Sequence, residues 1–199
     1  TTLSAGGANF SAGNGFGSIH GGAGADSISS DSAGDDALNS TILGGDGNDT
    51  IAGGGGNDTF KVTSGIDTIT DINTLDVFTV SAGATMNATG VVSFSATNAS
   101  SNSGEATLTA ATAGGSINMS SVGGAGGYTL IGSTKNDSLT GSGQNDVFEI
   151  KTAGAGDGDT LDGAGGTDTL KISVGTHTFA NDNLLKNLEK ILSMEIKNL

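Results

Sequence analysis

Aspartate recurs in this chain at a fixed spacing, and its carboxylate is the side chain with the clearest capacity for chemistry. Four stretches fit one nine-residue template, Gly-Gly-x-Gly-x-Asp-x-U-x, in which U is a large apolar residue. They are GGAGADSIS (21–29), DSAGDDALN (31–39), GGDGNDTIA (44–52) and GGGGNDTFK (53–61). The next two turns, 62–70 and 71–79, have lost most glycines but keep the Asp and the apolar residue in register.

A second array of the same template follows much later in the chain. It comprises GSTKNDSLT (132–140), GSGQNDVFE (141–149), GAGDGDTLD (154–162) and GAGGTDTLK (163–171). Each array contains a four-residue insertion, STIL (40–43) or IKTA (150–153), which we expect to lengthen a strand without breaking the winding. Upstream, the stretch 12–20 has Gly17 where the Asp should be, so we expect a weakened or missing site there.

The spacing predicts that carboxylates stack. If each nonapeptide forms half a coil, residues 18 apart lie on adjacent coils, separated by roughly 4.8 Å, the distance between strands of a sheet. An insertion lengthens this interval without changing the partners. The expected vertical pairs are Asp49 with Asp67, Asp58 with Asp76, Asp137 with Asp159, and Asp146 with Asp168.

Stacked carboxylates call for a divalent cation. Two ionised carboxylates at that distance repel each other, and a hard cation between them reverses the effect. Calcium accepts six to eight oxygens, from carboxylates and backbone carbonyls, in loose geometry, whereas magnesium requires a stricter octahedron. Zinc prefers His and Cys, and the chain has no Cys. An isolated Asp in such a sequence would be an ordinary turn residue, but the shared phase favours several bound calcium ions.

The elements that must position these carboxylates are short strands. Position U would point inward between two stacked sheets, while threonines at 50, 59, 68 and 79 suit the outer faces. The sequence therefore predicts an all-β solenoid. Its first array would have one thin apolar seam formed by Ile28, Leu38, Ile51, Phe60, Ile69 and Phe78.

Composition agrees with a solenoid. The 199 residues include 36 Gly and no Pro, Cys or Trp, and hydrophobic content is 34%, too lean for a conventional globular core. A disordered chain is the alternative, which the strict period argues against. The net charge of −14 opposes compaction without metal, so calcium binding and folding should be coupled. The same charge makes nucleic acid an unsuitable partner.

The remaining segments carry weaker signals. Residues 81–131 contain one acid, Glu105, and short alternating runs that favour metal-poor solenoid coils, with a flexible Ser/Thr-rich spacer as the alternative. Near the C-terminus, spacing permits a helix, but we favour a short helix or turn followed by a strand over 188–192 that caps the solenoid. We therefore divide the chain into 1–80, 81–131, 132–172 and 173–199.

Nothing in the sequence predicts an enzyme, a membrane span or a cleaved signal peptide. His20 and His177 are expected to be exposed polar residues, because no Gly-x-Ser-x-Gly or His-Glu-x-x-His motif accompanies them. No stretch is long and apolar enough to cross a bilayer, and no basic region precedes an apolar one at the N-terminus. Since the chain starts with TTLSAGG and lacks an initiator Met, we expect a fragment or a processed piece.

Both arrays resemble the RTX (repeats-in-toxin) calcium-binding repeats of bacterial proteins exported by type I secretion. The resemblance covers roughly 12–79 and 132–172 and implies a right-handed parallel β-roll with calcium bound in the glycine-rich turns. It implies ligands from the Asp at position six and carbonyls of the glycine loops. The residues so implicated are Asp26, Asp36, Asp49, Asp58, Asp67, Asp76, Asp137, Asp146, Asp159, Asp168, Gly22, Gly24, Gly45, Gly47, Gly54, Gly56, Gly141, Gly143, Gly163 and Gly165.

The same resemblance implies an extracellular location at the bacterial cell surface, reached without a cleaved N-terminal signal. The composition, poor in Cys, Pro, Arg and aromatics, is similar to that of S-layer (surface lattice) proteins and large adhesins. We expect self-association into a lattice, with cell-surface polysaccharide as a further candidate partner. The alternatives are the C-terminal export and folding module of a secreted protease, lipase or epimerase, and one segment of a giant adhesin.

Overall fold

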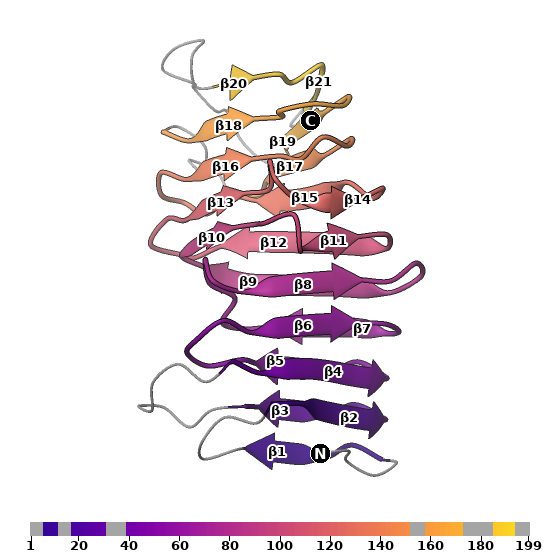
Figure 1. Cartoon of the computed structure of the whole chain (residues 1–199). Helices are drawn as coiled ribbons and strands as arrows, with labels where there is room; N and C mark the ends of the chain where they lie inside the picture. The colour runs from indigo at the N-terminus through magenta and orange to yellow at the C-terminus, as the bar shows by residue number, and fades with distance from the viewer. Residues whose placement is uncertain (1–5, 12–16, 31–38, 152–157, 173–184, 194–199) are drawn as a thin grey trace, which may run out of the picture.

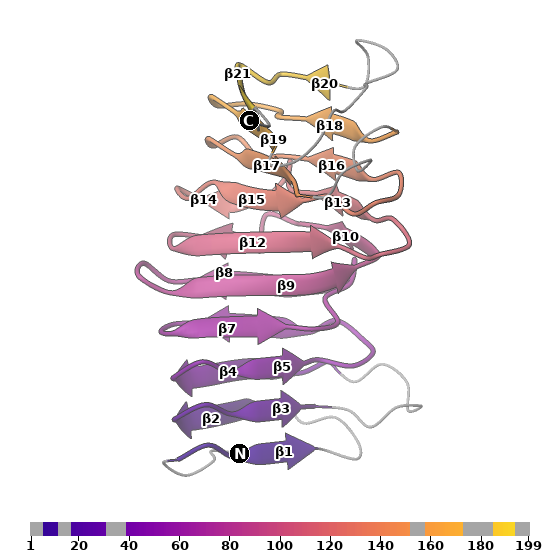
Figure 2. The same cartoon turned by 180° about the vertical axis from the view of Figure 1, so that it is seen from behind.

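The chain folds into a stack of short parallel strands. The computed structural model describes residues 6–11, 17–30, 39–151, 158–172 and 185–193. The described residues form 21 strands and no helix, and every strand pairing is parallel. Figures 1 and 2 show the strands as successive rungs, with β1 at one end of the stack and β21 at the other. The predicted all-β parallel solenoid is confirmed.

One sheet runs through the whole stack, and we call it the long sheet. Its ten strands follow the order of the chain, so each coil adds one strand to it. They are β1 (Asn9–Ser11), β3 (Ser27–Ser29), β5 (Thr50–Ala52), β7 (Ile66–Ile69), β9 (Thr85–Val91), β12 (Glu105–Ala110), β15 (Tyr128–Ile131), β17 (Val147–Ile150), β19 (Thr169–Ile172) and β21 (Lys190–Ser193).

Two shorter sheets flank the long sheet. The N-terminal side sheet contains β2 (Ile19–Ala23), β4 (Thr41–Asp46), β6 (Thr59–Val62), β8 (Val77–Val80), β11 (Ser101–Asn102) and β14 (Gly123–Gly124). The C-terminal side sheet contains β10 (Ser93–Ser95), β13 (Ser116–Asn118), β16 (Ser138–Thr140), β18 (Thr160–Asp162) and β20 (Leu185–Lys186).

The solenoid therefore changes its cross-section along its length. Up to β7 each coil alternates between the N-terminal side sheet and the long sheet, and from β17 it alternates between the long sheet and the C-terminal side sheet. From β8 to β16 each coil contributes a strand to all three sheets. The prediction of two stacked sheets is thus correct for the arrays but wrong for the middle, where each coil adds a third strand.

The predicted register is confirmed in the first array. Thr50 pairs with Thr68 and Thr59 with Val77, each 18 residues apart. Position U points inward, since Ile28, Ile51, Phe60, Ile69 and Phe78 are all buried, while the threonines of these strands are exposed or half-buried. Leu38, the sixth member of the predicted seam, lies outside the described residues.

The rung beside β6 corrects the placement of the STIL insertion. Ile42, not Leu38, pairs with Phe60, and Ser40 occupies the position equivalent to Asp58. Ser40-Thr41-Ile42 lies 18 residues before Asp58-Thr59-Phe60, so this segment forms a rung in its own right and begins the six-residue strand β4. The extra residues of the coil therefore precede Ser40.

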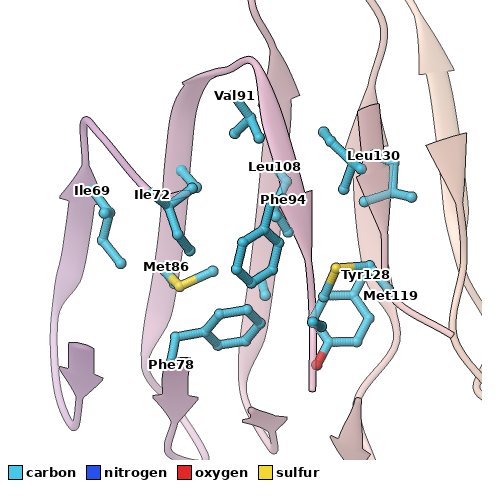
Figure 3. Close-up of a cluster of buried hydrophobic side chains, with 14 of the residues drawn as sticks. Ile69, Ile72, Phe78, Met86, Val91, Phe94, Leu108, Met119, Tyr128 and Leu130 are labelled. Carbon is cyan, nitrogen blue, oxygen red and sulfur yellow. The ribbon is translucent and has the colours of Figure 1, made fainter. Parts of the chain in front are cut away.

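The wider interior of the middle coils is filled by large side chains from all three sheets. Phe78 of β8, Phe94 of β10 and Tyr128 of β15 converge there, with ring centroids 5.8 Å apart for Phe78 and Phe94 and 6.2 Å apart for Phe78 and Tyr128. Figure 3 shows this cluster together with Met86 and Leu108. In the two-sided coils of the first array the core consists of smaller side chains from two sheets, chiefly Ile and Val with Phe60.

The weaker predictions for the other segments are confirmed in part. Strands run through 81–131, so the coil interpretation is confirmed and the flexible spacer is not. Near the C-terminus, the predicted strand is present as β21, and no helix occurs among residues 185–193. The proposed division into four domains, and capping by residues 173–199, stay predictions.

Candidate metal centre

Aspartates precede most strands of the first array, with Ser40 in the equivalent position before β4. Asp26, Asp49 and Asp67 form a vertical column beside the long sheet, and all three are buried. The backbone N–H of Asp26 donates to Oδ1 of Asp49 (2.8 Å), and that of Asp49 donates to Oδ1 of Asp67 (3.1 Å). Each carboxylate is therefore fixed by one oxygen to the rung that precedes it.

The other predicted vertical pairs are arranged in the same way. In each pair the N–H of the first Asp donates to Oδ1 of the second, at distances between 2.7 and 2.9 Å. The pairs are Asp58 with Asp76 beside the N-terminal side sheet, Asp137 with Asp159 beside the C-terminal side sheet, and Asp146 with Asp168 beside the long sheet. The predicted stacking is confirmed, whereas the role of these residues as ligands stays a prediction.

The second carboxylate oxygen is the chemically significant one. Oδ2 of Asp26, Asp49, Asp67 and Asp168 is buried and has no hydrogen-bond partner within the described part of the chain. A buried, unpaired anionic oxygen is costly, because it has lost its hydration and gained no donor. A bound cation would remove that cost.

The first glycine of the repeat makes room for this oxygen. A Cβ atom on Gly44 would collide with Oδ2 of Asp49 and lie 2.9 Å from Oδ2 of Asp67, so two carboxylates approach one point. A Cβ on Gly132 would likewise lie 3.2 Å from Oδ2 of both Asp137 and Asp159, although Oδ2 of Asp137 already accepts a hydrogen bond from the N–H of Ser133. Glycine is required here for lack of a side chain rather than for its backbone freedom.

Backbone carbonyls complete the same cradles. The Cβ position of Gly21 is flanked by Oδ2 of Asp26 and the carbonyl oxygen of Gly44, which lies on the next rung. The Cβ position of Gly163 is flanked by Oδ2 of Asp168 and the carbonyl of Asn187. Within the described residues no three His, Asp or Glu side chains form a ligand set, and the oxygens beside Oδ2 at Gly21 and Gly163 are backbone carbonyls. This mixed oxygen environment fits calcium.

Burial makes these carboxylates reluctant to ionise without a cation. Burial raises the pKa of Asp67 to about 7, and the neighbouring Asp49 carboxylate adds to the rise, although the Asp49 backbone N–H opposes it. Burial likewise raises the pKa of Asp76 and of Asp168 to about 6, and it raises the pKa of Asp49 and Asp146. A cation that displaces the proton would restore the charged form.

The predicted glycine ligands, whose role stays a prediction, differ in backbone conformation between the two arrays. Positive φ angles, which turn a peptide over, occur at the predicted Gly22, Gly24, Gly45, Gly47, Gly54 and Gly56. Gly141, Gly143, Gly163 and Gly165 do not adopt them. In the last of these turns the conformation belongs to Ala164 (67°) and Gly166 (116°), one position further along the chain.

Several residues at the site were missed by sequence reasoning. The prediction left out Gly21, Gly44, Gly53 and Gly132, the first glycines of their repeats. A Cβ atom added to any of them would lie against an Asp oxygen. Asp71 accepts hydrogen bonds from the N–H groups of Gly53 (3.0 Å) and Gly54 (2.8 Å). Glu189 accepts from Asp168 N at 2.7 Å and so continues the column. Its signal was present, since Glu189 precedes the apolar Ile191 by two positions.

The remaining predictions concern Asp36, His20 and His177. Asp36 lies outside the described residues, and Ser40 takes the place over Asp58. His20 is half-buried on β2 and its Nδ1 atom is shielded from solvent, so it is less exposed than expected. His177 also lies outside the described residues.

Comparison with known families agrees with this geometry. The family model of the RTX calcium-binding nonapeptide repeat, in four copies, matches residues 36–69 and 122–149. The chain carries RTX calcium-binding repeats. These RTX repeats bind calcium as a class, which agrees with the oxygen-only cradles. Searches of curated proteins and of solved structures found no match. Among the described residues, none belongs to a helix suited to crossing a bilayer.

Proposed function

We propose that this chain is a structural module of a secreted bacterial cell-surface protein that folds when its RTX repeats bind extracellular calcium. One observation carries the proposal: carboxylate oxygens of successive rungs are buried, unpartnered and directed into cradles lined by glycine and carbonyl oxygen. In the low-calcium cytoplasm these charges would oppose folding, and outside the cell calcium would neutralise them. RTX repeats are typical of secreted bacterial proteins, which supports this location.

We infer further that the module has an architectural role, most simply as a subunit of a surface lattice, and that it is not an enzyme. The long sheet passes through both arrays and the metal-poor middle, so calcium would stiffen one continuous rod. Outer faces rich in Thr and Ser suit lateral contact with other copies or with polysaccharide. The export module of a secreted enzyme and a segment of an adhesin are the competing assignments.

The test is calcium titration of the purified chain, followed by far-ultraviolet circular dichroism and by electron microscopy. Coupled folding predicts that chelator abolishes most of the β signal and that calcium restores it; an unchanged spectrum would contradict it. A lattice subunit should form ordered sheets as calcium rises. Monodisperse protein at high calcium would contradict the lattice while leaving calcium-dependent folding intact.

A further inference from the structure

The glycine-rich turns adopt two backbone conformations. In the turn Gly44–Asp49 the residues at positions two and four, Gly45 and Gly47, have φ angles of 113° and 120°. The turns that begin at Gly21 and Gly53 share this left-handed conformation. The last turn, Gly163–Asp168, keeps it through Ala164 and Gly166.

Two turns of the second array differ. Gly132–Asp137 has Ser133 at position two and Lys135 at position four, and Gly141–Asp146 has Ser142 and Gln144. All residues of both turns are described, and none has a positive φ angle. Both turns carry a side chain at positions two and four, and a Cβ atom disfavours the left-handed region that glycine enters freely. Ala164 shows that a Cβ at position two alone does not exclude this conformation, so the hydrogen bonds of the serines to their aspartates must contribute.

This change reverses the direction of the peptide N–H at position two. In the left-handed turn at Gly53, the N–H of Gly54 points away from its own Asp and donates to Asp71 of the neighbouring rung. In the serine turn, the N–H of Ser142 points inward and donates to Oδ2 of Asp146 at 2.6 Å. The Ser142 hydroxyl adds contacts of 3.1 and 3.0 Å to the two carboxylate oxygens.

The other serine turn repeats the arrangement. Ser133 N donates to Oδ2 of Asp137 at 2.6 Å, and the Ser133 hydroxyl lies 3.3 Å from Oδ1. The oxygen that is unpartnered in Asp26 and Asp49 is therefore occupied in Asp137 and Asp146. An inward N–H also carries partial positive charge, which repels a cation from the position it would take.

We propose that Asp137 and Asp146 are held by hydrogen bonds from Ser133 and Ser142 in place of calcium. The serine turns are then metal-independent rungs inside an RTX array, and calcium is confined to the left-handed turns. The second array can keep part of its order when calcium is withdrawn, because two of its carboxylates already have donors. This inference rests on the proposed calcium binding by the chain.

The first test compares calcium stoichiometry, measured by isothermal titration of the full chain, for Asp49→Asn and Asp146→Asn. Both variants remove one buried charge and keep the size of the side chain. Asp49→Asn should lower the number of bound ions by at least one, whereas Asp146→Asn should leave it unchanged. An equal loss in both variants would overturn the inference. Failure of the unaltered chain to bind calcium would instead overturn the proposed function, and the inference with it.

The second test restores the left-handed turn with the double change Ser133→Gly and Ser142→Gly. We expect more calcium bound per chain than in the unaltered protein. Terbium, a calcium substitute, gives an independent signal, because Tyr128 is the single tyrosine of a chain without tryptophan. Its N–H donates to Asp146 at 2.7 Å, so tyrosine-sensitised terbium emission should rise in the double variant. Unchanged stoichiometry and emission would show that serine does not exclude the ion.

Discussion

At one equivalent position in successive strands of the long sheet, the residue is acidic in the arrays and apolar in the middle coils. In register with Asp67 follow Met86, Ala106 and Tyr128, and the column then returns to Asp146. The strands pair in parallel throughout, with one register shift between β9 and β12. The middle residues fill the interior with apolar atoms, while the aspartates bring buried charge. We infer from this difference that the parallel ladder can form without metal, and that the proposed calcium dependence comes from the residues at this position.

Removing calcium with a chelator should produce the largest difference between the arrays and the middle coils. With calcium removed, we expect the first array to lose its order while β9 and β12 of the middle stay protected, because residues 81–131 contain a single acid. Hydrogen exchange resolved by peptide would report both regions in one experiment. Equal loss of protection in the two regions would show that the middle depends on the arrays for its stability.

The middle should be sensitive to packing instead. Leu108 is fully buried on β12, and Leu108→Ala should cost about 2–5 kcal/mol of unfolding free energy through the cavity it leaves. Urea denaturation followed by circular dichroism measures this. The loss should be the same in calcium and in chelator for the transition of the middle coils. A loss that appears only in calcium would tie the middle to the metal sites.

A methyl group at the first glycine should damage the arrays alone. Gly44→Ala places Cβ against Oδ2 of Asp49 and Asp67, and calcium affinity should fall tenfold or more, or about 1.4 kcal/mol. Gly143→Ala is the matched control, since its Cβ would meet nothing within 4 Å and its φ angle is ordinary. Calcium titration of both variants checks this. Similar losses in the two would mean that the cradle is not the site.

Acid should partly replace calcium in the arrays. The pKa of Asp67 is about 7 in the folded chain and near 3.8 when unfolded, so the metal-free fold holds a proton that the unfolded chain has released. The stabilisation that this proton gives to the metal-free fold is therefore greatest below pH about 4 and is lost as the pH rises toward 7. Thermal melting in chelator at pH 5 and 7.5 measures the effect, and Asp67→Asn should reduce it. A metal-free melting temperature that rises with pH would contradict this.

The smallest effect is expected from removing a hydrogen bond that lies outside the metal position. Asn48 accepts a hydrogen bond from the N–H of Ile66 at 3.0 Å, which links two rungs outside the metal position. Asn48→Ala should cost about 1 kcal/mol, with calcium stoichiometry unchanged. Melting and titration of the same sample distinguish this from loss of a metal site.

The nonapeptide period allowed the solenoid, its 18-residue register and the stacked carboxylates to be predicted, because period and geometry are linked directly. Ile51 and Phe60 point inward for that reason. The middle coils have no such period, so their third sheet could not be predicted; it depends on how Phe78, Phe94 and Tyr128 pack.

Within the site, the positions of the acidic residues could be predicted from the sequence more reliably than the backbone conformation of the turns. The rung of Ser40 was missed because serine replaces the expected Asp, although Ile42 and Phe60 keep the 18-residue spacing. The glycines of the second array were assigned by family resemblance, but backbone conformation follows the side chain at position two, where Ser142 and Ala164 behave differently. Only the structure shows which way that peptide points.

The central claim is that a shared calcium ion joins carboxylates on successive rungs. The most direct measurement is a crystal structure grown in calcium, with anomalous diffraction recorded at a wavelength where calcium scatters strongly. The account predicts an anomalous peak in contact with Oδ2 of both Asp49 and Asp67, beside Gly44. At saturating calcium, the absence of a peak there, with the two carboxylates turned toward solvent, would contradict it.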